Sequence, residues 1–382
     1  MDEIPMNSTP TARQNVLGLV LVVLLFLSAC GGDDNNGGGG GTPPVPPTPV
    51  VAFVANQTSN NVSAFTINAT GGALVPVAGS PFPVGTTPGG IAVSTDGTLA
   101  YVTNQGSNTV SAFSVNTATG VPTAVSGSPF GAGTTPFKVT VSPNRSFVYV
   151  TNQGSNNVSA FSIDALGRLT PVPGSPFATG LTPAGIALSP NGAFLYVANQ
   201  ASNNVSAFTV NAATGQLASV AGSPFAVGTT PFGVVVSPSG SFVYVTNQGS
   251  NFVSAFSITQ ATGVLTPVTG SPFVTGFTPA GITITPNGAF LYVANQASNN
   301  VSAFAATANG VLTPLGAPIP AGTTPTAVTI SPNGAFLYVA NQGSNDITAF
   351  AIEGASGSLT TVSGSPFAVG ITPRAIATAG RP

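Results

Sequence analysis

The chain has no histidine, no tryptophan and a single cysteine, and only 4% of its residues are charged, against about 25% in an average soluble protein. Without histidine it has no Ser–His or Cys–His catalytic pair and lacks the commonest metal ligand. A net charge of −2, with six Lys and Arg residues in all, excludes the basic clusters that nucleic acids and anionic membrane surfaces require. Composition therefore indicates neither a nucleic-acid-binding protein nor a histidine-dependent enzyme, and it predicts no cofactor.

Metal binding is not expected either. The carboxylates are dispersed, and the one cysteine stands apart from them. No stretch has the ligand spacing of a zinc or calcium site. The glycine run at 37–41 precedes no helical pattern, so it is not a phosphate-binding loop.

An apolar run at residues 16–27 precedes the cysteine. As a helix it would be about 18 Å long, too short for a hydrocarbon core of about 30 Å, so it suits a secretory signal. It is followed by the residues LSACG around Cys30, which resemble the lipobox of bacterial lipoproteins, a family in which this cysteine is acylated and becomes the mature N-terminus. We therefore expect a signal peptide at 1–29 and a lipid on Cys30. The alternative is a plain secretory signal or a short membrane anchor with an incidental cysteine.

The segment that follows is rich in glycine and then in proline. Such a composition predicts a flexible, partly extended linker. We expect residues 30–49 to form an acylated tether and residues 50–382 to form the folded domain. By its resemblance to lipoproteins, the chain would have the membrane as a partner through Cys30. Gly31, in place of an aspartate, favours the outer membrane of a bacterial cell envelope, with the domain in the periplasm or at the surface.

The rest of the chain consists of near-identical repeats of about 47 residues. Each repeat has four runs rich in β-branched and aromatic residues, separated by Gly, Pro and Asn turns, and none has useful helical periodicity. This length fits a four-stranded propeller blade. We predict an all-β, seven-bladed β-propeller. The phrase Tyr-Val-(Thr/Ala)-Asn-Gln marks the repeats, beginning at Tyr101, Tyr149, Tyr196, Tyr244, Tyr292 and Tyr338, with an earlier copy at Phe53.

The order of strands predicts how the ring closes. The innermost strand of each blade is expected to begin with Thr-Pro, but the chain enters the domain in a second strand and leaves it in a first strand. Residues 373–379 should therefore complete the sheet that residues 51–82 begin. One blade would then be shared by the two ends of the domain, which hides the sheet edges.

The Tyr-Val-Thr-Asn phrase at 101–104, 149–152 and 244–247, followed by Ser-Pro-x-Gly turns, resembles the YVTN-type β-propeller repeats. These repeats are similar to the lactonase family, the propellers that resemble 6-phosphogluconolactonase. The resemblance implies a propeller fold and a group that includes hydrolases of sugar lactones and surface-layer proteins. It also implies that the enzymes use His, Arg and carboxylates in a central cleft. This sequence has no histidine, and we can place no matching carboxylate, so no catalytic residue is carried over.

The few charges of the domain include three on the face where the Asn-Gln loops lie. Lys138 and Arg374 follow the Thr-Pro of an innermost strand, and Asp346 lies in an Asn-Gln loop. Together with a ring of Asn and Gln side chains, they form a candidate site for a small anionic or polyhydroxylated ligand. The alternative is that Asp346 and Arg374 form a local ion pair while Lys138 is merely solvated.

These observations leave several functions open. The absence of acid–base groups favours a membrane-tethered, non-catalytic module that binds a ligand or a protein partner, or acts as a scaffold, over an enzyme. The alternative is a lactone hydrolase acting at the channel mouth, with Lys138 and Arg374 as oxyanion or substrate clamps. A third possibility is self-association into a surface array, because a nearly neutral surface tolerates close contact.

Overall fold

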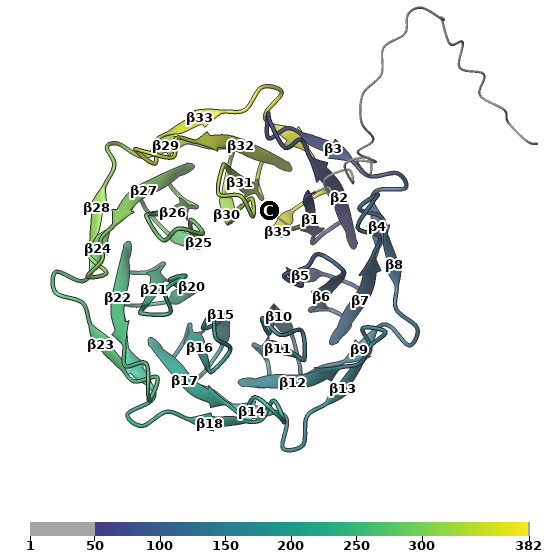
Figure 1. Cartoon of the computed structure of the whole chain (residues 1–382), viewed down its shortest axis with the longest axis horizontal. Helices are drawn as coiled ribbons and strands as arrows, with labels where there is room; N and C mark the ends of the chain where they lie inside the picture. Colours follow the sequence, from purple (N-terminus) through teal and green to yellow (C-terminus); the bar gives the residue numbers. More distant parts are fainter. Residues whose placement is uncertain (1–49, 381–382) are drawn as a thin grey trace, which may run out of the picture. The chain divides into compact units, whose positions relative to one another are not determined.

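The computed structural model describes residues 50–380, and every regular element in this part of the chain is a β-strand. Seven sheets stand around a central axis (Figure 1). In each sheet, four strands follow one another from the axis to the rim, and a short fifth strand also pairs with the third. The prediction of an all-β, seven-bladed propeller is confirmed, and the additional short strand is the one departure from it.

The strands occupy equivalent positions in each blade. The innermost strands are β35 (Pro373–Ala379), β5 (Pro88–Val93), β10 (Pro136–Val141), β15 (Pro183–Leu188), β20 (Pro231–Val236), β25 (Pro279–Ile284) and β30 (Pro325–Ile330). The second strands are β1 (Val50–Asn56), β6 (Leu99–Asn104), β11 (Phe147–Asn152), β16 (Phe194–Asn199), β21 (Phe242–Asn247), β26 (Phe290–Asn295) and β31 (Phe336–Asn341). The third strands are β2 (Asn61–Ile67), β7 (Thr109–Val115), β12 (Asn157–Ile163), β17 (Asn204–Val210), β22 (Phe252–Ile258), β27 (Asn300–Ala306) and β32 (Asp346–Ile352).

The outer strands are shorter. The fourth strands are β3 (Leu74–Pro76), β8 (Pro122–Ala124), β13 (Leu169–Pro171), β18 (Leu217–Ser219), β23 (Leu265–Pro267), β28 (Leu312–Pro314) and β33 (Leu359–Thr361). The fifth strands are β4 (Phe82–Pro83), β9 (Phe130–Gly131), β14 (Phe177–Ala178), β19 (Phe225–Ala226), β24 (Phe273–Val274), β29 (Ile319–Pro320) and β34 (Phe367–Ala368). Six of the seven fifth strands begin at the Phe of a Gly-Ser-Pro-Phe stretch, and β29 begins at the Ile of Gly-Ala-Pro-Ile. Two residues are too few to show a strand pattern in the sequence.

The ring closes as the sequence predicts. The first blade has the order β3-β2-β1-β35, so the last strand of the domain is its innermost strand (Figure 1). The pairing between β1 and β35 is antiparallel, from Val51 opposite Ala379 to Asn56 opposite Pro373. Closure by the C-terminal strand therefore joins the two ends of the domain through backbone hydrogen bonds within one sheet.

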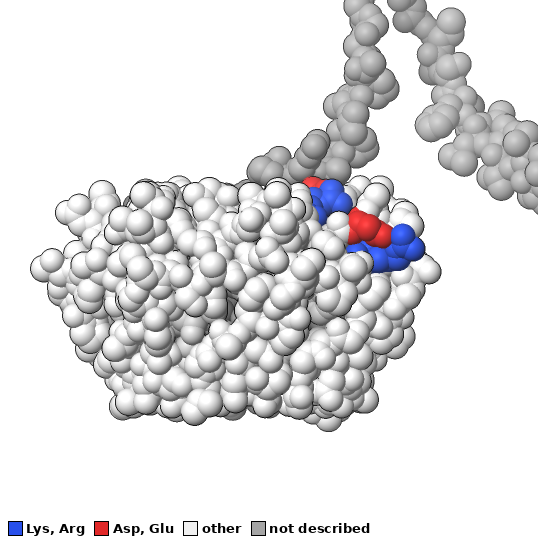
Figure 2. Space-filling model, turned by 90° about the horizontal axis from the view of Figure 1, so that it is seen from below, with Lys and Arg blue, Asp and Glu red and all other residues white. Residues whose placement is uncertain are grey.

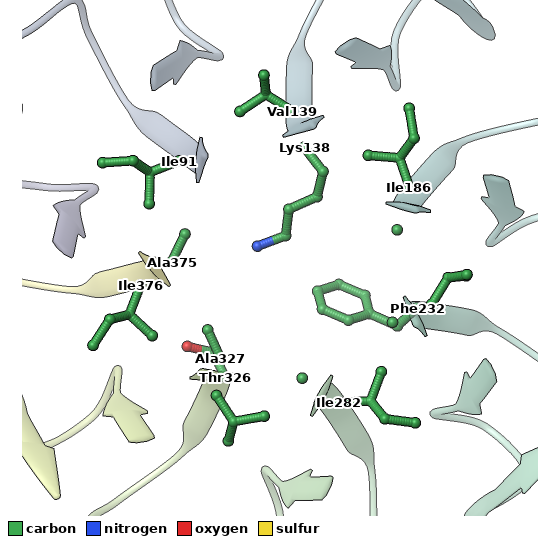
Figure 3. Close-up of a pocket in the computed structure, with 15 residues that line it drawn as sticks. Ile91, Lys138, Val139, Ile186, Phe232, Ile282, Thr326, Ala327, Ala375 and Ile376 are labelled. Atoms are coloured by element: carbon green, nitrogen blue, oxygen red, sulfur yellow. The ribbon is translucent and has the colours of Figure 1, made fainter. Parts of the chain in front are cut away.

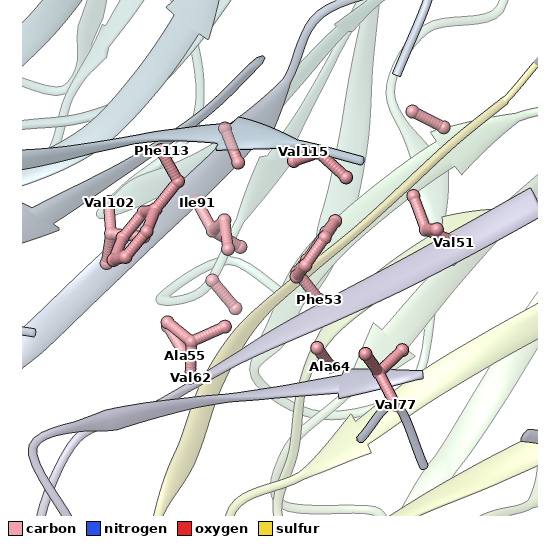
Figure 4. Close-up of a cluster of buried hydrophobic side chains, with 13 residues drawn as sticks. Val51, Phe53, Ala55, Val62, Ala64, Val77, Ile91, Val102, Phe113 and Val115 are labelled. Atoms are coloured by element: carbon pink, nitrogen blue, oxygen red, sulfur yellow. The ribbon is translucent and has the colours of Figure 1, made fainter. Parts of the chain in front are cut away.

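The hydrophobic core lies between neighbouring sheets. Figure 4 shows the cluster between the first two blades, where Val51 and Phe53 of β1 pack with Ile91, Val102 and the side chains around them. Both faces of each sheet are buried in this way, so the strands carry continuous apolar runs instead of alternating ones. The burial of neighbouring faces makes each blade depend on the next for its core.

The repeated Tyr of the marker phrase links neighbouring blades, whereas the repeated Asn links strands within one blade. The Tyr196 hydroxyl donates a hydrogen bond of 3.1 Å to the Gly263 carbonyl oxygen in the following blade. Asn199 is fully buried and donates from Nδ2 to Asn204 Oδ1 at 2.7 Å and to Ser206 Oγ at 2.8 Å. The recurrence of these residues has a structural reason, because they donate hydrogen bonds at equivalent places in the blades. The Asn199 Oδ1 atom itself is buried without a hydrogen-bond partner in residues 50–380.

Candidate functional site

The innermost strands converge on a central channel, and each has an irregularity close to its start. In β10, Pro136 pairs with Asn152 and Val139 pairs with Val150, so two residues stand opposite one. Such a bulge redirects the side chains that it contains. One of the two bulged residues is Lys138, and its N–H donates to Thr151 Oγ1 at 3.0 Å. The bulge therefore sets the direction of the lysine side chain.

The channel is open at this level because the corresponding residues of the other blades are small. A Cβ atom on Gly185 would lie 2.3 Å from the Phe232 carbonyl oxygen, and one on Gly233 would lie 2.5 Å from that of Ala280. Close approach of neighbouring innermost strands thus requires glycine at these two positions. Lysine is the only long side chain in the set, which comprises Gly90, Lys138, Gly185, Gly233, Gly281, Ala327 and Ala375.

Because these residues are small, a cavity of about 140 Å³ remains on the axis. Figure 3 shows the Lys138 side chain entering it, with Nζ near its centre and the Phe232 ring on the far side. The hydroxyl of Thr326 is a polar group of the wall. A layer of branched apolar side chains surrounds the cavity and consists of Ile91, Val139, Ile186, Val234, Ile282, Val328 and Ile376.

Lys138 has no carboxylate partner in this cavity, whose lining contains no acidic residue. Its ammonium nitrogen lies 5.3 Å from the centre of the Phe137 ring. Burial lowers the pKa of Lys138 to about 7, and the nearby positive charge of Arg374 contributes to this shift. About half of the amine is therefore neutral near pH 7, where an ordinary lysine is almost wholly protonated.

Arg374 approaches the same aromatic ring from another blade. It lies on β35, at a bulge of its own, and its guanidinium carbon is 5.5 Å from the Phe137 ring centre. Nη1 donates to Gln342 Oε1 at 3.1 Å, whereas Nε is buried without a hydrogen-bond partner among residues 50–380. Burial also lowers the pKa of Arg374. Two cations thus share one aromatic ring, and Arg374 retains donor capacity for a ligand.

Asp346 does not join these two cations. Its carboxylate accepts a hydrogen bond of 2.7 Å from Asn341 Nδ2 within its own blade. In the described part of the chain, ion pairs join Arg145 to Asp96 and Arg168 to Asp164. The Asp346–Arg374 pair considered from the sequence is therefore absent, and Gln342 takes the place of the carboxylate.

The remaining charges are few and local. Figure 2 shows one side of the propeller, where Lys, Arg, Asp and Glu atoms gather at a single place near the rim of one face. The ion pair between Arg168 Nε and Asp164 Oδ2, 2.6 Å long, is formed by exposed side chains four residues apart, and pairs of that kind contribute little. Within residues 50–380, Lys138 and Arg374 are partly buried and form no ion pair, and the same is true of Asp346.

A ring of glutamine side chains surrounds the mouth of the channel. Neighbouring blades are linked by hydrogen bonds from Gln200 to Gln248 at 3.3 Å and from Gln248 to Gln296 at 3.2 Å. The sequence suggested a ring of both Asn and Gln, but the asparagines of the marker phrase are fully buried inside the blades. The partly exposed amides of the marker phrase are those of Gln57, Gln105, Gln153, Gln200, Gln248, Gln296 and Gln342.

Two other classes of site are not formed in residues 50–380. No group of three or more Cys, Asp or Glu side chains lies close enough to hold a metal ion. No helix in this part of the chain could span a bilayer. The segments predicted as a signal peptide (1–29) and as an acylated tether (30–49, with Cys30) lie outside the described residues.

Comparisons with known proteins agree on the fold. No curated protein matches the sequence significantly. A candidate 6-phosphogluconolactonase from Bacteroides fragilis has 22% identity and a TM-score of 0.77, covering 88% of this chain and 100% of its own. The periplasmic gluconolactonase of Pseudomonas aeruginosa has 20% identity and a TM-score of 0.74, covering 87% and 99%. Hydrazine synthase of Kuenenia stuttgartiensis has 20% identity and a TM-score of 0.61, covering 80% and 92%. Structural similarity at this level thus includes proteins named for different reactions, a lactonase and a hydrazine synthase.

The sequence itself matches one family profile repeatedly. The family is described as lactonase, 7-bladed beta-propeller, and its matches cover residues 138–230, 166–278, 225–327 and 320–380. Together they span more than half of the chain, including Lys138 and Arg374. The chain therefore belongs to the seven-bladed β-propeller lactonase family.

Proposed function

We propose that this propeller hydrolyses small lactones in its central cavity. The observation that carries the proposal is the partly neutral Lys138 amine, which shares the Phe137 ring with Arg374. The sequence favoured a non-catalytic module because it has no histidine. A lysine with a pKa of about 7 replaces that missing base, because general bases work best with a pKa near the working pH. Membership of the lactonase family supports the same choice.

Lys138 and Arg374 suit the proton transfer and the negative charge on oxygen that ring opening requires. The neutral Lys138 amine accepts a proton from water as the water oxygen attacks the lactone carbonyl. Arg374 donates N–H groups to the oxygen that becomes negative, as in other oxyanion sites. The ring C–O bond then breaks, and the Lys138 ammonium returns its proton to the departing alkoxide. The products are a hydroxy acid and the amine in its starting state.

The size of the cavity limits the substrate. A space of about 140 Å³ is smaller than the pockets that enclose drug-sized ligands, so it suits a single lactone ring. The glutamine ring above it offers donors and acceptors for hydroxyl groups. We therefore expect a polyhydroxylated lactone, with its ring in the cavity and its hydroxylated chain at the mouth.

Lys138→Ala is expected to lower kcat/KM for an aldonolactone at least 100-fold, because it removes the only group in the cavity that can take up a proton near neutral pH. Arg374→Gln should lower it about 10- to 100-fold through loss of oxyanion stabilisation. The rate of acid release from δ-gluconolactone above the spontaneous rate, followed at constant pH, measures both effects.

Arg168→Gln is the matched control, because it removes an exposed guanidinium that directly precedes β13, an outer strand at the opposite side of its sheet from the channel. Its kcat/KM should equal that of the wild type. Equal turnover by the wild type and Lys138→Ala, or no turnover of any lactone by a folded wild type, would overturn the proposal. Binding without turnover would instead support the module that the sequence favoured.

We also propose that the propeller is exported and held at the membrane by a lipid on Cys30. The support is the apolar run at 16–27, the LSACG motif and the lone cysteine. Cells grown with a labelled fatty acid should incorporate the label into the wild type and not into Cys30→Ser. Equal labelling of the two proteins would contradict the anchor, while loss of label with retained export would fit it.

A further inference from the structure

We infer that the Lys138 amine binds carbon dioxide and is held in the central cavity as a carbamate. Three features carry this inference: the isolation of the amine in an apolar cavity, the guanidinium beside it, and the absence of any carboxylate from the cavity lining. A carbamate is an anion, so its formation supplies the negative charge that the two cations lack.

The electrostatics of the cavity favour this product. Lys138 and Arg374 lie 5.3 and 5.5 Å from the centre of the same ring. When both are protonated, two like charges are buried together, which is costly. Conversion of Lys138 to a carbamate replaces the repulsion by an attraction to Arg374. The unpartnered Nε–H of Arg374 is a donor that this carboxylate can use.

The cavity also suits the reactant. Carbon dioxide is small and uncharged. A cavity lined by branched apolar side chains such as Ile91, Val139 and Ile186 accommodates such a molecule more favourably than an ion. The reaction needs a neutral amine. With a pKa of about 7, half of the Lys138 amine is neutral near pH 7, compared with roughly one part in 2,500 for a free lysine.

The step is a balanced addition. The nitrogen lone pair forms an N–C bond to the carbon of carbon dioxide, and one C=O electron pair moves to oxygen. The nitrogen then loses a proton to solvent through the channel mouth. No oxidant, reductant or acid catalyst is required. An imine with an aldehyde would need a proton donor to expel water from the carbinolamine, and apart from Lys138 the only polar side chain of the cavity lining is that of Thr326.

One consequence rests on the proposed function. A carbamate would place a carboxylate in a cavity whose lining has no acidic side chain. In the modified protein this carboxylate, instead of the neutral amine, would accept the proton of the attacking water. Lactone turnover should then rise at least three-fold when bicarbonate is added to carbon-dioxide-free enzyme. The modification itself rests on the cavity alone and is measured separately.

The chain offers an unusually simple test, because Lys138 is its only lysine. Full-length protein in ¹³C-labelled bicarbonate at about pH 8 should give one ¹³C carbamate resonance besides that of the α-amino group. Lys138→Arg, which keeps the charge, should lose this resonance. Arg374→Gln should weaken it at least ten-fold. Identical spectra for the wild type and Lys138→Arg would overturn the inference.

A second readout needs no variant. A trialkyloxonium reagent converts a carbamate into a stable ester, and peptide mass spectrometry then locates it. An ester on the peptide that contains Lys138 supports the inference, and an ester confined to the N-terminal peptide refutes it. Carbamate without turnover of lactone would leave the modification standing and the lactonase proposal refuted. Turnover of lactone without carbamate would refute the modification and leave the lactonase proposal standing.

Discussion

A chain that ends at Thr372 should show no cooperative unfolding transition at room temperature. The deletion removes β35, the innermost strand of the first blade, together with its full pairing to β1. It exposes both the backbone edge of β1 and apolar side chains that were buried on either side of the missing strand. The whole ring is affected, because each blade shares its core with its neighbours.

The size of the effect follows from what is removed. Ala375, Ile376 and Ala379 are all buried in the complete protein. The loss of one buried isoleucine side chain alone costs about 2–5 kcal/mol, and a typical domain is stable by only about 5–15 kcal/mol. The loss of a whole strand with its hydrogen bonds should therefore consume most or all of the folding free energy.

Thermal and urea unfolding, followed by near-ultraviolet circular dichroism, measure this effect. A chain ending at Gly380 keeps β35 and is the matched control; its unfolding midpoint should equal that of the wild type. A synthetic peptide of residues 369–382 added to the truncated chain should restore part of the signal, because the missing strand is supplied in trans. An unchanged midpoint in the truncated chain would show that β35 does not seal the ring.

Lys138→Met should stabilise the protein below neutral pH, by up to about 4 kcal/mol near pH 6. Burial lowers the pKa of Lys138 to about 7, whereas an unfolded lysine has a pKa of about 10.4. At pH 6 the folded protein must hold a buried ammonium beside Arg374, and this cost is absent from a methionine of similar length.

The sign of the pH dependence follows from the direction of the shift. Between about pH 7 and 10 the unfolded chain binds more protons at Lys138 than the folded protein does, so the free energy of unfolding of the wild type rises with pH. The rise should vanish in Lys138→Met, and the two proteins should become equally stable near pH 10. Above that, both lose stability, because burial raises the pKa of tyrosines such as Tyr196 and Tyr244.

Urea unfolding in carbon-dioxide-free buffers from pH 6 to 10 checks this prediction. Arg168→Met is the control, because its exposed guanidinium should change stability by less than about 0.5 kcal/mol at any pH in the range. Parallel curves for the wild type and Lys138→Met would mean that the Lys138 ammonium is fully solvated in the folded protein.

Much of the fold could be predicted because repetition makes local patterns unambiguous. Seven copies of the same four runs define a blade, and the Thr-Pro pairs show which run is innermost. Entry in a second strand at Val50 and exit in a first strand near Ala379 then permit one closure, which the pairing of β1 with β35 confirms. The same Thr-Pro pairs place Lys138 and Arg374, which follow them closely, near the axis.

Other parts of the site could not be predicted from the repeat. Asn199 and Gln200 are adjacent in the marker phrase, yet one is buried in the blade and the other stands at the mouth. Asp346 begins the third strand of its blade, the position that Asn204 occupies in another blade. Its carboxylate therefore accepts a hydrogen bond from Asn341, as Asn204 does from its own blade's asparagine, and does not pair with Arg374. These differences depend on hydrogen-bond partners that come from other strands.

The sequence by itself determined the number of blades, the order of strands in each and the strand that seals the ring. Only the tertiary structure decided that Lys138 and Arg374 meet on Phe137, and that Lys138 enters a cavity whose lining has no carboxylate. The physical reason is that local periodicity sets which residues form strands, whereas the direction of a side chain at a bulge depends on the blades beside it. Close approach of the glycine-bearing innermost strands leaves the space on the axis, and the lysine side chain occupies it.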